Sequence, residues 1–378
     1  MQDNSSCIAS LAVKAPASRI LLRGIRLLSG FIFLFIAGVV SAEPVQEDWP
    51  RLGGKTTENS DPSSWAIAFD NDVLAPGLRD QDYTYGFNVT STGKRAKNQW
   101  ASLHRLLARL NRRIGLDAQT GTAISASKFE YGLFGFTPEE ISRAEPIEDD
   151  RPYASLIYVS STTEHYDSLR EVSWQSTLTL GVMGLGIVGD IQDVVHSAAG
   201  WKIPEGWDNQ ISDGGEPTVR YSVSRQHLMF KSGSGLELKD TWQGSIGYIT
   251  EVSWSLSTRA GKIHTPWVSF NPELTSYGEK SIPNTTAKIS EQYVWAGVSL
   301  KLRAYNAFLS GQFRRSAVTY RSDEINHAIV EAWIGYTLAL TDGYSFTYSI
   351  RAHSSELKRG SGDRTVIWGG VLLSRNFG

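Results

Sequence analysis

Cysteine is nearly absent from this sequence. The one Cys among 378 residues is Cys7, so disulfides within the chain and zinc sites built on several thiolates are excluded. A charge excess is also missing, because 37 Lys and Arg residues stand against 39 Asp and Glu residues, for a net charge of −2. Nucleic-acid binders usually carry a basic excess, so no nucleic-acid partner is expected.

Long apolar runs are missing after residue 42. None approaches the ~20 residues that a membrane-spanning helix needs, and the mean hydropathy is −0.24. Both observations argue against a helical membrane protein. They do not exclude a transmembrane barrel, whose apolar face is hidden in residue alternation.

The N-terminal segment has the pattern of a secretory signal. Basic residues between positions 14 and 26 precede an apolar run over 27–40, and Ala42 closes the segment. This order predicts a signal peptide over 1–42. A membrane anchor is the disfavoured alternative, because the run is shorter than a spanning helix. Cleavage would remove Cys7 and leave an N-terminal extension over 43–63, followed by a β domain over 64–378.

The rest of the chain alternates apolar and polar residues with a period of two, which indicates β-strands. The stretches 172–182 and 344–352 show this alternation clearly. About twelve segments follow the pattern: 64–71, 83–92, 126–135, 151–162, 171–183, 218–230, 240–254, 264–271, 290–303, 327–340, 344–355 and 364–377.

Two all-β folds compete for this pattern. A sandwich packs the alternating face against a second sheet, whereas an outer-membrane barrel turns it toward lipid and keeps small or polar residues inside. The polar set Ser173, Gln175 and Thr177 favours the barrel, as do aromatic residues near strand ends and the rhythm of short and long links. We therefore predict a transmembrane antiparallel β-barrel of about 12 strands, with short helices in its loops.

The segment 98–114 has a helical period instead. Its apolar positions include Trp100, Leu103 and Leu107, and its other face is basic, with Arg105, Arg109, Arg112 and Arg113. Since it follows an even-numbered strand, we expect it at the periplasmic end. Two interpretations stay open: a membrane-surface helix on anionic lipid, or a helix that caps the base of the barrel.

Acidic residues gather at the tips of the first hairpin. Asp70, Asp72, Asp80 and Asp82 suggest a hard cation with oxygen ligands, such as Ca²⁺. Solvated acidic loops are the simpler alternative. Strand alternation would turn Asp70, Asp72 and Thr84 inward and Tyr83 outward.

Two further loops carry side chains that could bind substrate or act in catalysis. Arg143 and Arg151 can bind phosphate through forked hydrogen bonds, although Arg151 is equally suited to an inward wall position beside Asp150. Gln192 and His196 share a face if 190–199 is a helix. A neutral imidazole can act as a general base near pH 7, whereas a lone His is more often structural. No Gly-x-Ser-x-Gly element is present, so a hydrolase would use a His-activated water.

Taken together, these motifs resemble the outer-membrane lipid A 3′-O-deacylase family (the LpxR type). The resemblance rests on five motifs in order: Phe69-Asp-Asn71-Asp72, Asp82-Tyr-Thr84-x-Gly86, Asp150-Arg-Pro-Tyr-Ala154, Gln192-x-x-x-His196 and Gly206-Trp-Asp-Asn-Gln210. It is strongest over 65–225.

The resemblance implies a twelve-stranded barrel in the Gram-negative outer membrane and calcium-dependent hydrolysis of the 3′-linked acyloxyacyl ester of lipid A in the outer leaflet. It implies that His196 is the general base and that Asn71, Asp72 and Thr84 form the polar wall beside it. Substrate binding is assigned to Arg143, Gln192 and Arg151, and metal binding to Asp72 and Asp82. The family pattern suggests two adjacent basic residues near the substrate phosphate, where this sequence has Arg143 alone between Ser142 and Ala144.

Two other functions stay open. An outer-membrane phospholipase would need a Ser beside His196 on the outer wall, and a porin-like barrel would have no enzymatic site. A barrel of ~12 strands whose lumen is filled by side chains would count against a porin. A monomer is expected.

Overall fold

The structure is a computed structural model that describes residues 63–77, 82–116, 124–167, 169–233, 235–275 and 290–377. The chain divides into two units, 1–48 and 49–378, and the described residues all belong to the second. The predicted signal peptide over 1–42 lies outside the described residues, as does the extension over 43–63 except for its last residue.

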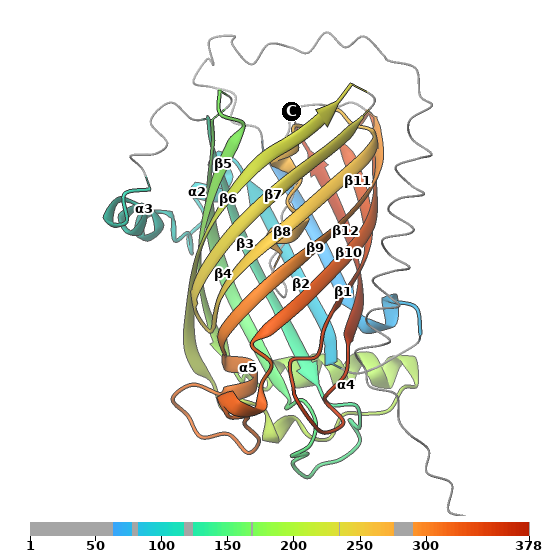
Figure 1. Ribbon diagram of the computed structural model, residues 1–378. Helices are drawn as coiled ribbons and strands as arrows, with labels where there is room; N and C mark the ends of the chain where they lie inside the picture. The colour runs from blue at the N-terminus through green and yellow to red at the C-terminus, as the bar shows by residue number, and fades with distance from the viewer. Residues whose placement is uncertain are drawn as a thin grey trace, which may run out of the picture. The chain divides into compact units, whose positions relative to one another are not determined.

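Twelve antiparallel strands form a closed barrel, in which each strand pairs with its sequence neighbours and β1 pairs with β12 (Figure 1). The predicted barrel is therefore confirmed. The strands are β1 Ser64–Asn71, β2 Asp82–Thr92, β3 Ile124–Thr137, β4 Ala154–Asp167, β5 Val172–Met183, β6 Glu216–Ser232, β7 Leu236–Gly247, β8 Ile249–Lys262, β9 Glu291–Asn306, β10 Ala328–Ala339, β11 Tyr344–His353 and β12 Val366–Asn376.

Short helices occupy the links between strands. The α-helices are α2 Lys94–Lys97, α3 His104–Arg113, α4 Ile187–Ala199 and α5 Ala307–Ser310. The 3₁₀ helices are η1 Asp72–Leu74, η3 Trp207–Asn209, η4 Trp267–Ser269, η5 Pro272–Leu274 and η6 Ser322–Glu324. Among the helices in the described ranges, none has the length and apolar content to cross a membrane.

The two faces of the barrel wall follow the residue alternation. Inside, polar side chains satisfy one another, as in the 2.8 Å contact between the hydroxyls of Thr162 and Thr177. Outside, large apolar side chains such as Trp242 and Leu300 are about half exposed. An apolar outer face over a polar interior is the arrangement that lipid requires of a barrel.

Two of the twelve predicted segments are wrong in a compensating way. The predicted strand 240–254 is a hairpin, β7 and β8, joined through Tyr248 alone. Tyr248 and Ile249 are buried in an apolar cluster, so this turn lacks the polar residues that usually mark one. The predicted strand 264–271 is instead an irregular segment that contains η4, and Pro266 starts it without a ladder donor.

The barrel has a terminal end, where β1 begins and β12 ends, and a loop end, where α4 and α5 lie (Figure 1). At the loop end the interior is filled by aromatic side chains, among them Phe134, Phe136 and Phe308, whose ring centroids lie 5.3 to 5.8 Å apart. Such packing leaves no open passage through that cluster.

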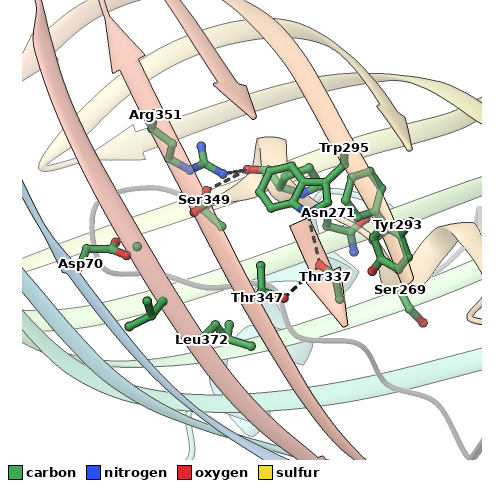
Figure 2. Close-up of a pocket in the computed structure, with 15 residues that line it drawn as sticks. Asp70, Ser269, Asn271, Tyr293, Trp295, Thr337, Thr347, Ser349, Arg351 and Leu372 are labelled. Atoms are coloured by element: carbon green, nitrogen blue, oxygen red, sulfur yellow. Dashed lines mark hydrogen bonds between the residues drawn. The ribbon is translucent and has the colours of Figure 1, made fainter. Parts of the chain in front are cut away.

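The segment 263–275 folds into the interior on the side of the terminal end. Lys239 of β7 donates to Asn271 Oδ1 over 2.7 Å and forms a 2.8 Å ion pair with Glu273. Arg351 of β11 donates to the carbonyl of Pro272, and Figure 2 shows it with Trp295 of β9 around this segment. The cavity that remains beside this segment is about 80 Å³, so the segment occupies part of the lumen at this end.

Candidate active site

A β-bulge changes the expected direction of Thr84. The register between β2 and β3 shifts between Tyr83 and Tyr85, which places one extra residue on β2 and reverses the alternation before it. Tyr83 therefore packs inside, 5.3 Å from the ring of Trp368. Thr84 lies on the outer side, where its hydroxyl is 2.6 Å from that of Thr137. The predictions that Tyr83 points outward and Thr84 inward are wrong for this reason.

Helix α4 docks on the outer wall over this part of the barrel. Its C-terminus is set by Gly200, whose φ of 71° is the left-handed conformation that ends many helices. The hydroxyl of Tyr85 donates to the carbonyl of Val188. A close approach is possible because Gly135 of β3 has no side chain: a Cβ there would lie 3.2 Å from both Trp207 and Val188.

Gln192 and His196 lie on the same face of α4, as predicted, and both are buried. The Trp207 indole N–H donates to Gln192 Oε1 over 2.8 Å, so the amide nitrogen of Gln192 is the group that faces His196 Nε2, at 3.3 Å. His196 Nδ1 lies 2.5 Å from the carbonyl of Lys202, which can only accept. These partners assign a neutral imidazole with its proton on Nδ1 and its lone pair on Nε2.

Asn71 lies on the outer side of the wall where β1 ends, and the buried Asp72 follows it as the first residue of η1. Asn71 Nδ2 donates to the carbonyl of Thr84 over 2.5 Å, and its Oδ1 accepts from Val73 N over 2.7 Å. The alternation that would turn Asp72 inward stops at Asn71, because Asp72 begins η1. This short helix folds onto outward residues of β11 and β12: Tyr348 donates to the carbonyl of Leu74 over 2.7 Å.

Arg143 lies in the link between β3 and β4, which packs beside η3. The amide of Glu205 donates to Ile141 O, and Asn209 Nδ2 donates to Ala144 O over 2.7 Å. Arg143 itself is exposed, and its carbonyl lies close to Gly206. The exposed guanidinium thus belongs to a loop that contacts the segment carrying Trp207.

Two predicted site residues are held in ion pairs. Arg151 is buried, forms an ion pair with Glu356 and stacks its guanidinium 4.3 Å from the centre of the interior Phe136 ring. Asp82, opposite Thr137 in the β2–β3 ladder, receives two 2.9 Å contacts from Arg364. Both side chains are thus engaged in ion pairs of the barrel's own structure.

The described residues do not make up a calcium cage. No three His, Cys, Asp or Glu side chains within those ranges come together as a metal site. Ca²⁺ takes six to eight oxygen ligands, more than the two predicted carboxylates, Asp72 and Asp82, can supply by themselves. Since Asp82 is engaged by Arg364, calcium stays a prediction from the sequence.

One carboxyl on α4 has a perturbed pKa. Partial burial raises the pKa of Asp193 above its usual range, and the neighbouring Asp190 adds to this rise. Ionisation of Asp193 therefore makes the docked position of α4 less favourable.

The sequence reasoning missed Gly135 and Thr137, which position the site on β3. Gly135 stands at an outward position where the strand elsewhere carries large residues such as Tyr131 and Leu133. A missing side chain on an otherwise apolar face is a signal of close approach by another element.

A family model described as "Outer membrane protein LpxR" matches residues 31–377. Among solved structures, LpxR from Salmonella typhimurium superposes with a TM-score of 0.63 at 15% identity, covering 82% of this chain and 99% of that one. The β domain of the Bordetella autotransporter BrkA gives a TM-score of 0.40 at 11% identity, covering 84% and 99%. No curated protein sequence matches the chain.

Proposed function

The chain belongs to the LpxR outer membrane protein family, and from this premise we propose that it hydrolyses the 3′-linked acyloxyacyl ester of lipid A. As a barrel of this family, the protein resides in the outer membrane of the Gram-negative type. The first strand begins and the last strand ends at the terminal end of the barrel; we assign this end to the periplasm, and the loop end faces outward.

The proposal rests on one observation: α4 carries Gln192 and His196 on the outer wall and not in the interior. The outer wall is the surface that membrane lipid contacts. At the loop end, that lipid is lipopolysaccharide in the outer leaflet. An ester of lipid A can therefore reach this site without leaving the membrane.

His196 is the proposed general base. Its Nδ1 proton is directed to Lys202 O, so Nε2, which faces the Gln192 amide at 3.3 Å in this structure, is the atom that accepts a proton from a water taking the place of that contact. The water oxygen then bonds to the ester carbonyl carbon. When the carbon–oxygen bond to the sugar breaks, the imidazolium returns the proton to the departing oxygen, so that the products are a carboxylic acid and an alcohol. Gln192, fixed by Trp207, is a positioning residue for this imidazole.

Negative charge develops on the carbonyl oxygen during the attack, and donors at that position would lower the barrier. The Thr84 hydroxyl and the Asn71 amide are the donors that the outer wall supplies near the end of β1. Arg143, exposed in the adjoining loop, is suited to a phosphate of the lipid A headgroup.

Calcium dependence stays part of the proposal, and no step above relies on it. Its test is chelation: loss of activity with EGTA, restored by added Ca²⁺, would support a bound ion. Unchanged activity after chelation would remove calcium from the account.

The substrate is tested with purified protein in detergent micelles. We expect release of the 3′-linked acyl group from lipid A, detected by mass spectrometry, and no release from phosphatidylethanolamine or phosphatidylglycerol. Hydrolysis of the phospholipids alone would make the protein a phospholipase. Ion conductance in planar bilayers with no ester hydrolysis would favour a channel, although the filled interior argues against one.

A further inference from the structure

Helix α3 is docked on the outer wall of the barrel, which favours the first of the two open interpretations, a membrane-surface helix, over a helix that caps the base. Asn111 Nδ2 donates to the hydroxyl of Ser176 on β5 over 2.8 Å, and Tyr221 of β6 donates to Asn111 Oδ1 over 2.9 Å. The backbone N–H of Leu103 donates to the hydroxyl of Ser161 on β4 over 2.9 Å. These bonds are made by outward-facing residues of the strands, so α3 lies on the lipid side of the wall.

The helix covers the periplasmic half of this wall. Outward residues beneath it, such as Ser176 and Leu178, are almost fully buried. Two residues further toward the loop end, Leu180 is 36% exposed, and Tyr131 on the outward face of β3 is 51% exposed. The change from covered to exposed wall places α3 in the half of the barrel that crosses the inner leaflet.

The link that carries α3 is strongly basic. Between Gly93 and Leu116 it has seven Lys or Arg residues and no Asp or Glu. Arg105, Arg109 and Arg112 follow one another at intervals of four and three, so they share one face of the helix. All three are exposed, and among the described residues no carboxylate forms an ion pair with them.

Exposed apolar side chains lie on the same link. Trp100, which precedes α3, is 97% exposed, and Leu106 on α3 and Ile114 at its C-terminus are about half exposed. A segment that presents arginines together with Trp and aliphatic side chains suits the boundary between lipid headgroups and acyl chains. Exposure of these apolar side chains to water would be unfavourable.

We propose that α3 is a binding surface for the anionic phospholipid headgroups of the periplasmic leaflet. Asn111 and Leu107 hold the helix to the barrel, while Arg105, Arg109 and Arg112 pair with lipid phosphates. Charge complementarity selects the occupant, because residues 93–116 carry a net charge of +7 and the neighbouring phase is a membrane. This surface is separate from the proposed active site, which lies toward the other end of the wall.

Native mass spectrometry of the detergent-solubilised barrel tests the proposal directly. Phosphatidylglycerol and phosphatidylcholine with identical acyl chains are added together, and bound copies of each are counted. We expect a preference for phosphatidylglycerol that weakens as ionic strength rises. The triple variant Arg105→Gln, Arg109→Gln, Arg112→Gln is expected to bind phosphatidylglycerol about 100-fold more weakly, at about a fivefold loss for each arginine.

Three controls make the result decisive. Arg314→Gln, Arg315→Gln, Arg321→Gln removes the same charge at the loop end and should leave lipid preference unchanged. Replacing Arg105, Arg109 and Arg112 by Lys keeps the positive charge and should keep the preference for phosphatidylglycerol. The heat-dependent gel shift of the barrel verifies that each variant is folded. A wild-type protein with no preference, a triple Gln variant that binds like wild type, or displacement of the lipid by inorganic phosphate would each overturn the proposal.

Discussion

The interior and the outer wall of this barrel use polar side chains in opposite ways. Inside, charged groups are paired with one another, as Arg303 is with Glu251 and Glu356. Outside, two helices carry polar groups to a surface that usually shows only apolar residues to lipid. The comparison supports our proposal that the interior serves stability and that the outer wall carries the active site.

The largest effect is expected from His196 on the outer wall. His196→Ala should lower kcat about 1,000-fold, since a general base contributes on the order of 10² to 10⁴, while the barrel stays folded. Deacylation of purified lipid A measures this. His227→Ala is the matched control, because His227 contacts Asp240 far from α4. Full activity of the His196 variant would mean that the base lies elsewhere.

The interior makes the reverse prediction. Arg303→Met takes the ion-pair partner from the buried Glu251 and leaves Glu356 paired with Arg151 alone. Breaking a buried pair destabilises a protein by about 3–5 kcal/mol. Urea unfolding in detergent should show this loss, whereas the folded fraction should deacylate at the wild-type rate. Arg321→Met, which removes an exposed ion pair with Asp323, should change stability by less than about 1 kcal/mol. A lower deacylation rate of the folded Arg303 variant would contradict the proposal that the interior serves stability alone.

A smaller loss is expected where α4 meets the wall. In Gly135→Val the new side chain would occupy the space of Trp207 and Val188 and shift Gln192 through its bond to Trp207. Misplacement by about 1 Å can cost about 100-fold in rate, so a loss of about 10- to 100-fold is expected. Gly186→Ala, which meets no atom within 4 Å, should be close to neutral. Equal rates for the two variants would contradict the docking of α4 as a requirement for activity.

The smallest effect concerns the stability of α4 against pH. Because the pKa of Asp193 is raised in the folded protein by burial and by Asp190, its protonated form favours the docked helix at low pH. That contribution is lost as pH rises through the folded pKa. Asp193→Asn should therefore slow amide hydrogen exchange of α4 at pH 7 and change it little near pH 3. Faster exchange of the variant at pH 7 would mean that the Asp193 carboxylate stabilises α4, which contradicts this prediction.

The barrel itself was predictable because alternation is a property of single strands. Where a strand ends because of side-chain packing, alternation could not predict the end. The β7–β8 turn has buried Tyr248 and Ile249 in place of polar residues. The predicted strand 264–271 alternates like a strand in sequence, although the segment is irregular and folds into the lumen. Gln192 and His196 were paired correctly because helix spacing is local. The direction of Thr84 depends on a bulge, and the place of α3 depends on hydrogen bonds to Ser161 and Ser176, distant in sequence.

The most direct test of the outer-wall site is mass spectrometry of lipid A from cells that express the protein. Three strains are compared: empty vector, wild type and His196→Ala, with barrel folding verified in each membrane. Lipid A from the wild-type strain should lose the mass of its 3′-linked acyloxyacyl group, while the other two spectra should match one another. An unchanged spectrum from the wild-type strain with calcium present, or the same mass loss from the His196 variant, would contradict the account.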